Sequence, residues 1–410
     1  MPNIALNNDE ATDRMVEDIV ITGMGVVSAI GVGIEETLSS LLTGETGVGK
    51  IKYLDTIHTD IPVGEVKMSN EEMAAKLGLD DTSMMTRNAL IGIMALREAI
   101  DDAGLSQQML PDIPLVSGTT VGGMDRREQH APLINSLESA IFETHNSGDN
   151  TEMIADACGQ FKSLITVSTA CSSAANAIIM GANMLRSGLT EKVIVGGVEC
   201  ITKFHLNGFN TLMILDEKQC KPFDKERGGL NLGEGAAYMV LETASAAMAR
   251  NKKPICKLSG YGNRCDAFHQ TASSPDGEGA YLAMTEALES ANLSAKDIDY
   301  INAHGTGTLN NDESETAAIK RVFGKEIPPM SSTKSFTGHT TSASGAIESV
   351  FCALALQHQF LPINLNWGKK MEDGITPVTD MKPNGAIKHI LCNAFGFGGN
   401  DSALVFSSNE

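Results

Sequence analysis

The sequence predicts an α/β fold. Short apolar, β-rich runs recur at residues 20–22, 115–116, 192–197 and 299–303, and each is followed by a loop and a stretch of helical composition. The chain has 410 residues and a hydrophobic content of 42%, which is enough for a sizeable core. Strands that are separated by helices favour a mostly parallel sheet covered on both faces.

The first run leads into Gly23 and Gly25. This pair is a fragment of the glycine fingerprint of dinucleotide-binding folds, and the third glycine of that fingerprint is missing. We therefore interpret the pair as a turn from a strand into a loop.

Two helices rich in small residues are predicted, one in each half of the chain. They open at residues 168–175 (STACSSAA) and 338–346 (GHTTSASGA). Small residues allow a helix to be buried closely against its neighbours. The likeness suggests an old duplication with halves at 18–255 and 256–410. Because no Pro/Ser-rich linker separates these halves, we expect one compact body.

Composition argues against several classes of protein. The net charge of −20 disfavours nonspecific binding to nucleic acid or to an anionic membrane. The apolar runs are far shorter than the roughly 20 residues of a membrane-spanning helix. Residues 1–17 are polar and acidic, unlike a signal or transit peptide, and predict a partly disordered leader. Eight cysteines without a C-x-x-C pair argue against a zinc site and a disulfide framework, so we expect a cytoplasmic protein without a bound metal.

Cys171 is the candidate nucleophile. It follows the β-branched run 165–167 and stands at the start of the first small-residue helix. Unpaired backbone N–H groups and the helix dipole at such a position favour a thiolate. The alternative is a buried structural cysteine, which is the interpretation that we prefer for the other seven.

His304 and His339 are the candidate partners of this cysteine. His304 follows an apolar run and precedes a Gly-Thr-Gly-Thr turn, so it lies where a buried strand ends, the usual place of sites in α/β sheets. His339 opens the second small-residue helix, whose N-terminus should keep the imidazole ring neutral. Either histidine could instead be a structural hydrogen-bonding residue.

A glycine-rich turn, residues 393–401 (NAFGFGGND), follows a predicted strand at 387–392. Glycines at this density allow a backbone to turn sharply or to bring N–H groups close to a ligand. A plain tight turn would need fewer glycines.

Four segments in this order resemble the elongating β-ketoacyl-[acyl-carrier-protein] synthases of the thiolase superfamily: VSTACSSAAN, NAHGTGTLNND, STKSFTGHTTSASGA and NAFGFGGND. The likeness runs nearly end to end and includes VITGMGVVSAIG, SGTTVGGMD and PFDKERGGLNLGEGAAYMVLE. It implies the thiolase fold, a duplicated five-layer α-β-α-β-α architecture. The implied reaction is decarboxylative condensation of an acyl-cysteine with malonyl-[acyl-carrier-protein], in fatty acid or specialised polyene or polyketide biosynthesis. No bound cofactor is implied besides the phosphopantetheine of the carrier, although the family sometimes holds a structural monovalent cation.

The resemblance also implies roles for single residues. Cys171 would carry the acyl chain as a thioester, and the backbone N–H groups of Cys171 and Phe397 would form the oxyanion hole. His304 and His339 would donate Nε2–H bonds to the malonyl thioester oxygen, while the Phe397 side chain would gate the site. Lys334 and Glu348 would support the histidines. The implied substrate-binding residues are Thr306, Thr308, Val121 and Phe395.

Other members of the same superfamily are alternative assignments for this chain. A thiolase would use a second cysteine in a Cys-x-Gly setting, but Cys392 is followed by Asn393 and Ala394. A chain-initiating synthase would have an asparagine at the position of His339. A noncatalytic subunit of the chain-length-factor type would leave Cys171 idle, and it stays the alternative function. The implied partners are an acyl carrier protein and either a second copy in a homodimer or such a subunit in a heterodimer.

Two features depart from the usual pattern of the family. Residues 77–90 offer few basic side chains for an acidic carrier, namely Arg87 and the nearby Lys76, so the docking patch looks thinned. Asn176 is more polar than expected near the nucleophile; facing an acyl tunnel it would suit a short, unsaturated or polyketide chain, and facing away it would be a helix hydrogen-bonding residue. We hypothesise a specialised pathway, such as polyene formation.

Other candidate residues for docking the acidic carrier are Arg126, Arg127, Lys203 and Arg264.

Overall fold

The strands of the computed structural model, which describes residues 17–79, 85–130 and 146–409, form one 11-stranded sheet. Ten of them follow the order β4-β3-β5-β6-β1-β7-β11-β10-β8-β9, and β2 pairs with β1 at the side. Their bounds are β1 (Ile19–Ser28), β2 (Gly31–Val32), β3 (Leu115–Gly118), β4 (Leu164–Val167), β5 (Lys192–Glu199), β6 (Gly235–Thr243), β7 (Cys256–Cys265), β8 (Tyr300–Asn302), β9 (Met330–Ser331), β10 (His389–Gly396) and β11 (Asn400–Ser407).

The same strand arrangement occurs twice. The order β4-β3-β5-β6-β1 in the first half matches β9-β8-β10-β11-β7 in the second. In each half, the second strand of this order is parallel to both neighbours, and the fourth is antiparallel to both. The halves join where β1 pairs with the start of β7. The α/β class and the duplication are therefore confirmed.

The expectation of a mostly parallel sheet is wrong. Antiparallel pairs outnumber parallel ones among the described strands, because β1, β6, β7 and β11 run antiparallel to their neighbours. β1 and β6 are buried along nearly their whole length. An antiparallel strand covered on both faces has the same continuous apolar run as a parallel one, so hydropathy could not tell them apart.

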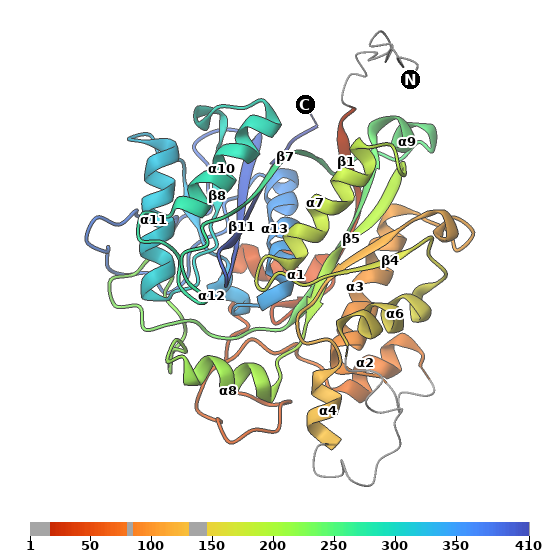
Figure 1. Ribbon diagram of the computed structural model, residues 1–410, viewed down its shortest axis with the longest axis horizontal. Coiled ribbons are helices and arrows are strands. Elements are labelled where there is room, and N and C mark those ends of the chain that lie inside the picture. Colours follow the sequence, from red (N-terminus) through yellow and green to blue (C-terminus); the bar gives the residue numbers. More distant parts are fainter. Residues whose placement is uncertain (1–16, 80–84, 131–145, 410) are drawn as a thin grey trace, which may run out of the picture.

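Helices form three layers that alternate with the two halves of the sheet (Figure 1). α3 packs on the outer face of the first half, α10 and α11 cover the outer face of the second, and α7 and α13 lie between them. This is the five-layer arrangement. The helix bounds are α1 (Ile34–Thr43), α2 (Asn70–Leu77), α3 (Arg87–Ala103), α4 (Met124–His130), α6 (Ser147–Cys158), α7 (Ser173–Arg186), α8 (Lys203–Thr211), α9 (Ala244–Ala249), α10 (Glu278–Ala291), α11 (Leu309–Phe323), α12 (Lys334–Thr337) and α13 (Ser344–His358), with short 3-10 turns at Leu110–Asp112, Ala295–Asp297 and Thr341–Ala343.

Gly23 and Gly25 lie inside β1 and do not form the expected turn. A Cβ atom at Gly25 would lie 2.2 Å from the carbonyl oxygen of Ala95, and one at Gly23 would lie 2.6 Å from that of Ala99. Both carbonyls belong to α3. The two glycines therefore allow α3 to approach the strand closely. A local sequence pattern cannot indicate this packing, because α3 comes much later in the chain.

The two small-residue helices meet in the central layer, as expected from their composition. α13 is buried from Ser344 to Leu356, and a Cβ atom at Gly345 would lie 2.7 Å from the backbone nitrogen of Ala175 in α7. The N-termini of α7 and α13 consequently lie side by side, which brings the segments before them together.

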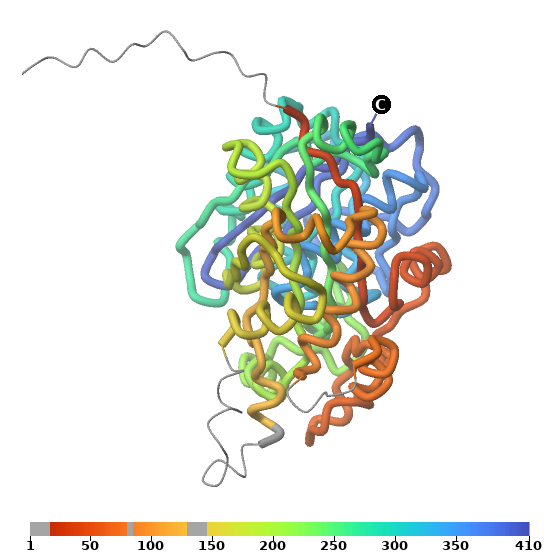
Figure 2. The backbone as a smooth tube through the Cα atoms, turned by 90° about the vertical axis from the view of Figure 1, so that its right-hand side faces the viewer, coloured from red at the N-terminus to blue at the C-terminus, as the bar shows by residue number. Residues whose placement is uncertain are grey.

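The connection from β2 to α3, which contains α1 and α2, runs along the outside of the molecule (Figure 2). None of the helices in the described part of the chain combines the length and apolar character needed to cross a bilayer. Residues 1–16, most of the predicted leader, lie outside the described residues.

Candidate active site

Cys171 lies in the turn between β4 and α7. Ala170 before it has a φ of 52°, a left-handed conformation that is uncommon outside glycine and bends the chain sharply. The hydroxyl of Ser173 fixes this turn, since it accepts a bond from the Thr169 N–H at 2.9 Å and donates to the Ala170 carbonyl at 2.6 Å. The Cys171 side chain is buried and lines a cavity.

His339 faces this cysteine from the segment before α13. Its Nε2 atom lies 3.1 Å from Cys171 Sγ, and its Nδ1 atom lies 3.0 Å from the Ser344 hydroxyl at the start of α13. The His339 backbone N–H donates to the Asn231 carbonyl at 2.7 Å. Contacts on both ring nitrogens and on the backbone thus hold the imidazole against the sulfur.

His304 follows β8 and completes the group. Its ring centroid lies 5.3 Å from that of His339, with the planes nearly perpendicular, and 5.6 Å from that of Phe395. The backbone N–H groups of His304 and Gly305 donate to the two carboxylate oxygens of Glu315, at 2.8 and 2.7 Å. The structure therefore brings together all three residues that were expected to act together.

Burial sets the protonation states of the group. It raises the pKa of Cys171 to about 11, although the charge of Lys334 and hydrogen bonding from the backbone of Phe397 and of Cys171 itself oppose the shift. Burial, together with the Lys334 charge, holds the pKa values of His304 and His339 well below the usual 6.5. The resting state is a neutral thiol against a neutral imidazole. Burial outweighs the helix-start effect expected from the sequence, so a base must take the thiol proton when the sulfur reacts.

Lys334 and Glu348 form a buried pair beside the histidines. Lys334 Nζ lies 2.5 Å from Glu348 Oε1, and both side chains are nearly inaccessible. Burial raises the pKa of Glu348 to about 7, while the lysine charge opposes the shift. Since the two residues stand in α12 and α13, on either side of His339 in the chain, the pair braces the segment that carries this histidine.

The cavity has a volume of about 240 Å³ and reaches Cys171, His304 and His339. Phe397 stacks on the ring of Phe209 from α8, with centroids 5.9 Å apart. The expected residues that line the cavity are Thr306, Thr308, Phe395 and Phe397, and an apolar wall is added by Phe209, Met213, Leu230 and Leu309. The Thr306 and Thr308 hydroxyls lie 2.9 Å apart and give one side a polar strip.

Val121 and Asn176 are not among the residues that line this cavity. Val121 is buried in the core around α3, and its N–H donates to Glu199 Oε1 at 3.1 Å. Asn176 bonds to other polar side chains, among them Asn400. The structure therefore gives no support to Val121 as a wall of this cavity, and it assigns Asn176 to the hydrogen-bonding alternative.

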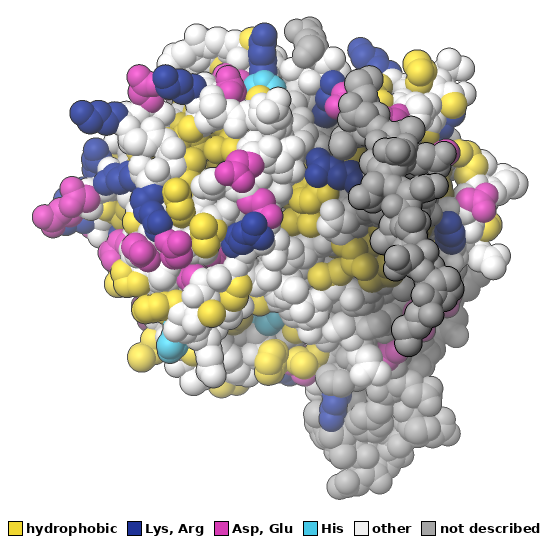
Figure 3. Space-filling view, turned by 45° about the horizontal axis from the view of Figure 1, so that its top comes forward, with side chains coloured by type: hydrophobic (Ala, Val, Ile, Leu, Met, Phe, Trp, Pro, Cys, Tyr) yellow, Lys and Arg dark blue, Asp and Glu magenta, His cyan; other side chains and the backbone are white. Residues whose placement is uncertain are grey.

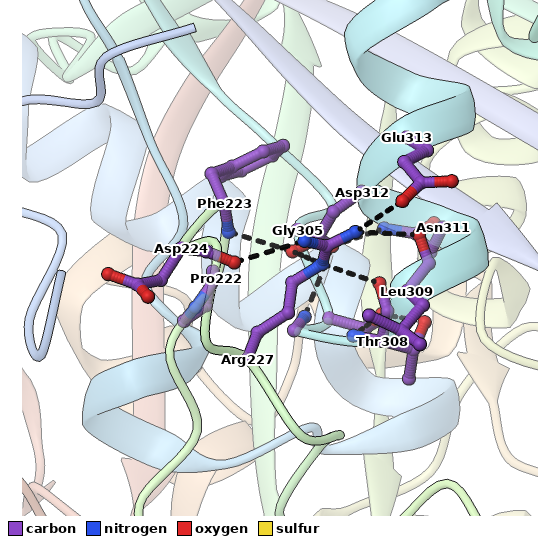
Figure 4. Close-up of polar contacts among 12 residues, drawn as sticks. Pro222, Phe223, Asp224, Arg227, Gly305, Thr308, Leu309, Asn311, Asp312 and Glu313 are labelled. Atoms are coloured by element: carbon purple, nitrogen blue, oxygen red, sulfur yellow. Dashed lines mark hydrogen bonds and ion pairs between the residues drawn. The ribbon is translucent and has the colours of Figure 1, made fainter. Parts of the chain in front are cut away.

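Two buried carboxylates on α11 were missed by the sequence reasoning. Besides Glu315, Asp312 accepts bonds from the N–H groups of Phe223, at 2.7 Å, and Gly307, at 3.1 Å. Arg227 Nε lies 3.6 Å from the same carboxylate, and its guanidinium donates to the carbonyls of Thr308 and Leu309 (Figure 4). These contacts fix the loop after His304. Acidic residues three apart in a helix normally indicate a solvated face, so no local signal marked them.

The basic residues expected to dock a carrier are mostly engaged. Arg87 is buried and donates to Glu234 through Nε and Nη2, so it offers no surface charge. Lys203 pairs with Asp55, Arg264 pairs with Glu286, and Arg126 and Arg127 lie in α4. Residues 80–84 lie outside the described part. On the face drawn in Figure 3, Lys and Arg side chains lie among Asp and Glu, so the coloured, described part of that face shows no single-sign patch.

Known proteins are similar to this chain in both sequence and fold. Family models match residues 16–247 ("Beta-ketoacyl synthase, N-terminal domain") and residues 255–368 ("Beta-ketoacyl synthase, C-terminal domain"). The chain is 33% identical to 3-oxoacyl-[acyl-carrier-protein] synthase 2 of Vibrio harveyi, over 95% of this chain and 98% of the relative. It is also 33% identical to the enzyme of the same name from Staphylococcus aureus, over 96% and 98%.

Two solved structures are similar at comparable identity. A chain of the ishigamide ketosynthase/chain length factor superposes with a TM-score of 0.90 at 30% identity, covering 96% of this chain and 100% of that one. The ketosynthase ApeO in complex with its chain length factor ApeC, from Xenorhabdus doucetiae, matches with a TM-score of 0.83 at 29% identity, covering 96% and 98%. The family models, the curated relatives and the shared architecture agree, and the chain belongs to the beta-ketoacyl synthase family.

Proposed function

We propose that this protein is a 3-oxoacyl-[acyl-carrier-protein] synthase that extends an acyl chain by decarboxylative condensation with a malonyl unit. The observation that carries the proposal is the 3.1 Å contact between Cys171 Sγ and His339 Nε2, in a cavity that His304 also lines. The curated relatives at 33% identity bear this activity in their names.

The first half of the reaction loads Cys171. His339 takes the thiol proton, and the sulfur attacks the carbonyl carbon of an acyl-carrier thioester. The carbonyl oxygen becomes negative and accepts bonds from the backbone N–H groups of Cys171 and Phe397. When the intermediate collapses, the C–S bond to the phosphopantetheine breaks, and the leaving sulfur recovers the proton from His339.

The second half forms the new carbon–carbon bond. The malonyl carboxylate leaves as carbon dioxide, and the electron pair of the broken bond forms an enolate whose oxygen accepts bonds from His304 and His339. Their depressed pKa values keep both rings neutral near pH 7, and a neutral ring donates from Nε2 only when its single proton stands on that atom. His339 has returned the thiol proton from Nε2, so its remaining ring proton must first shift from Nδ1 to Nε2. The enolate carbon attacks the acyl-Cys171 carbonyl, whose oxygen takes up the electron pair of the C=O π bond. When this oxyanion collapses, the C–S bond to Cys171 breaks, and the released thiolate takes a proton from water.

The carrier's phosphopantetheine would enter through the cavity. The hydroxyls of Thr306 and Thr308 would bond its amide groups, and the aromatic rings of Phe209 and Phe397 would pack on its apolar carbons. In this proposal the protein holds no organic cofactor of its own.

A structural monovalent cation fits the donors present. The side-chain oxygens of Asn302 (Oδ1), Glu348 (Oε2) and Asn393 (Oδ1) are buried and have no hydrogen-bond partner among the described residues. Amide and carboxylate oxygens of this kind suit hard cations. These residues would hold the ion, which would supply a positive charge close to the Lys334–Glu348 pair.

The protein would act as a dimer. β4 ends the sheet and pairs only with β3 among the described strands, and Leu164 on it is exposed. An open sheet edge with apolar side chains favours pairing with another chain. The partner is a second copy or a chain-length-factor-like subunit, such as the one that accompanies the ketosynthase ApeO. We also infer a division of the chain at residue 255, supported by the repeated strand order.

The decisive experiment is intact-protein mass spectrometry after incubation with acyl carriers of varied length and saturation. One acyl adduct is expected on the parent chain, none on Cys171→Ala, and an unchanged adduct on the matched variant Cys265→Ala, because Cys265 is exposed and outside the cavity. The preferred mass distinguishes saturated chains from polyenoyl ones. No adduct with any carrier would favour the noncatalytic-subunit alternative.

A further inference from the structure

The two N–H groups of the proposed oxyanion hole come from opposite halves of the chain. The Cys171 N–H belongs to the turn before α7, and the Phe397 N–H belongs to the loop between β10 and β11. Stabilisation of an oxyanion depends on donors held at a defined separation. Some contact between the two segments must therefore set this separation.

The two segments touch closely beside the sulfur. A Cβ atom at Gly396 would lie 2.8 Å from the Thr169 carbonyl oxygen and 3.0 Å from Ser172 Oγ. Glycine at position 396 thus lets the loop pack directly on the turn that carries Cys171. Van der Waals contact limits how near the segments come but does not stop them from sliding or parting.

Asn400 bonds the two segments together. It stands three residues after Phe397, at the first position of β11, and its Oδ1 atom lies 2.7 Å from Asn176 Nδ2 and 2.7 Å from Ser172 Oγ. Ser172 directly follows Cys171, and Asn176 is in the first turn of α7. The side-chain oxygen of Asn400, at the end of the loop, therefore accepts hydrogen bonds from the segment that carries the nucleophile.

Asn263 on β7 closes the group. Its Nδ2 atom lies 3.0 Å from Asn400 Oδ1, 3.0 Å from Asn176 Oδ1 and 2.9 Å from the Ser402 hydroxyl. Ser402 in turn donates to Asn176 Oδ1 at 3.1 Å. Asn176, Asn263 and Asn400, which we name the amide triad, thus satisfy one another across α7, β7 and β11.

The amide triad lies outside the cavity, since none of its three members lines it. Its side chains are half-buried, and within the described part of the chain they make no hydrogen bond to the sulfur or to either histidine. Since the amide triad is not part of the cavity wall around Cys171, we expect its effect on the reaction to act through the segments it joins.

We propose that the amide triad is a positioning device that holds the Phe397 loop at a fixed distance from the Cys171 turn and so aligns the two oxyanion donors. Asn400 is its central acceptor. The inference rests on the proposed function, because it assumes acyl transfer to Cys171.

The hydrogen-bond directions predict an asymmetry between two isosteric substitutions. Asn400→Asp keeps an oxygen acceptor where all the close donors converge, so it should retain most of the acyl-transfer rate. Asn176→Asp places a carboxylate oxygen against Asn400 Oδ1, where a donor is required, and should slow acyl transfer. Asn400→Ala should slow it by roughly 10- to 100-fold, since a misplacement of about 1 Å can cost on the order of 100-fold in rate. Asn183→Ala, on the same helix but bonded to Tyr261, is the matched control and should behave like the parent chain.

Two rates measured on each variant decide the question. The first is acyl transfer from an acyl carrier to Cys171, followed by mass spectrometry, and the second is alkylation of Cys171 by iodoacetamide, which forms no oxyanion. The proposal expects Asn400→Ala and Asn176→Asp to lose acyl transfer at unchanged alkylation rate, with Asn400→Asp close to the parent chain. Equal acyl-transfer rates in all variants overturn the proposal. It is also overturned if acyl transfer and alkylation are slowed together and Asn400→Asp is slowed as much as the other variants. A parent chain that accepts no acyl group overturns the proposed function itself.

Discussion

The Nε2 atom of His339 lies 3.1 Å from the sulfur of Cys171, and both groups are buried in neutral form. This pair joins residues of opposite halves of the chain, and it makes the thiol reactive only when the imidazole accepts its proton. The chemistry proposed here depends on that transfer, and it is open to direct tests.

Alkylation of Cys171 should accelerate far into the alkaline range. With a thiol pKa of about 11, the thiolate fraction, and with it the iodoacetamide rate, rises roughly tenfold per pH unit between pH 7 and 10. Peptide mass spectrometry across this range measures the rate, and Cys171→Ala identifies the adduct. A plateau below pH 8 would show that the sulfur is already ionised at rest.

Removing either histidine should affect different steps of the reaction. His304→Ala should leave loading of Cys171 near the parent rate, because His304 makes no contact with the sulfur, but should slow malonyl decarboxylation on the order of 100-fold. His339→Ala should slow both steps. Acyl-adduct formation and release of labelled carbon dioxide are measured on each variant, and identical losses in both steps for His304→Ala would contradict the assignment.

Glu315→Ala should destabilise the fold. Its carboxylate accepts the N–H groups of His304 and Gly305 and a bond from Asn393 Nδ2. Removal leaves two buried backbone donors without a partner and Asn393 Nδ2 with only the weak acceptor Met284 Sδ, at a cost of about 3 kcal/mol or more. Glu313→Ala, on the exposed side of the same helix, should change the free energy of unfolding by about 1 kcal/mol or less. Urea unfolding of both variants makes the comparison, and equal midpoints would refute the role of Glu315.

Asp401→Asn should change how stability depends on pH. Burial, with the charges of Asp266 and Glu315, raises the pKa of Asp401 to about 8, whereas an unfolded aspartate titrates near 3.9. The folded state therefore binds an extra proton between about pH 4 and 8, and this residue makes the protein less stable as pH rises through that window. The neutral asparagine should gain stability over the parent chain steadily up to pH 8 and no further. Thermal unfolding from pH 4 to 9 tests this, with Asp101→Asn on the exposed face of α3 as the control that should keep the parent's profile.

The strand predictions succeeded where the apolar run was short and bounded. The runs at 115–116 and 192–197 lie in β3 and β5, whereas β8 covers only the middle of 299–303 and β10 starts two residues after the predicted 387. The direction of the strands could not be predicted, because burial on both faces removes the alternation of apolar and polar residues that marks an antiparallel strand. The turn predicted at Gly23 and Gly25 is wrong because the glycines are needed for contact with α3, which lies 70 or more residues away in the chain.

The sequence by itself determined the candidate chemistry, because Cys171, His304, His339 and the glycine-rich turn stand in segments whose types and order resemble one family over nearly the whole chain. Tertiary structure alone decided what surrounds them. Phe209 stacks on Phe397 and the amide triad joins the two halves, both through contacts between residues far apart in the chain. Glu315 and Asp312 support the His304 loop from the helix that follows it, where only the packed fold turns their carboxylates toward the backbone N–H groups. Protonation likewise depends on burial, a property of the packed interior, and that is why a thiol placed at a helix start has a raised pKa in the folded protein.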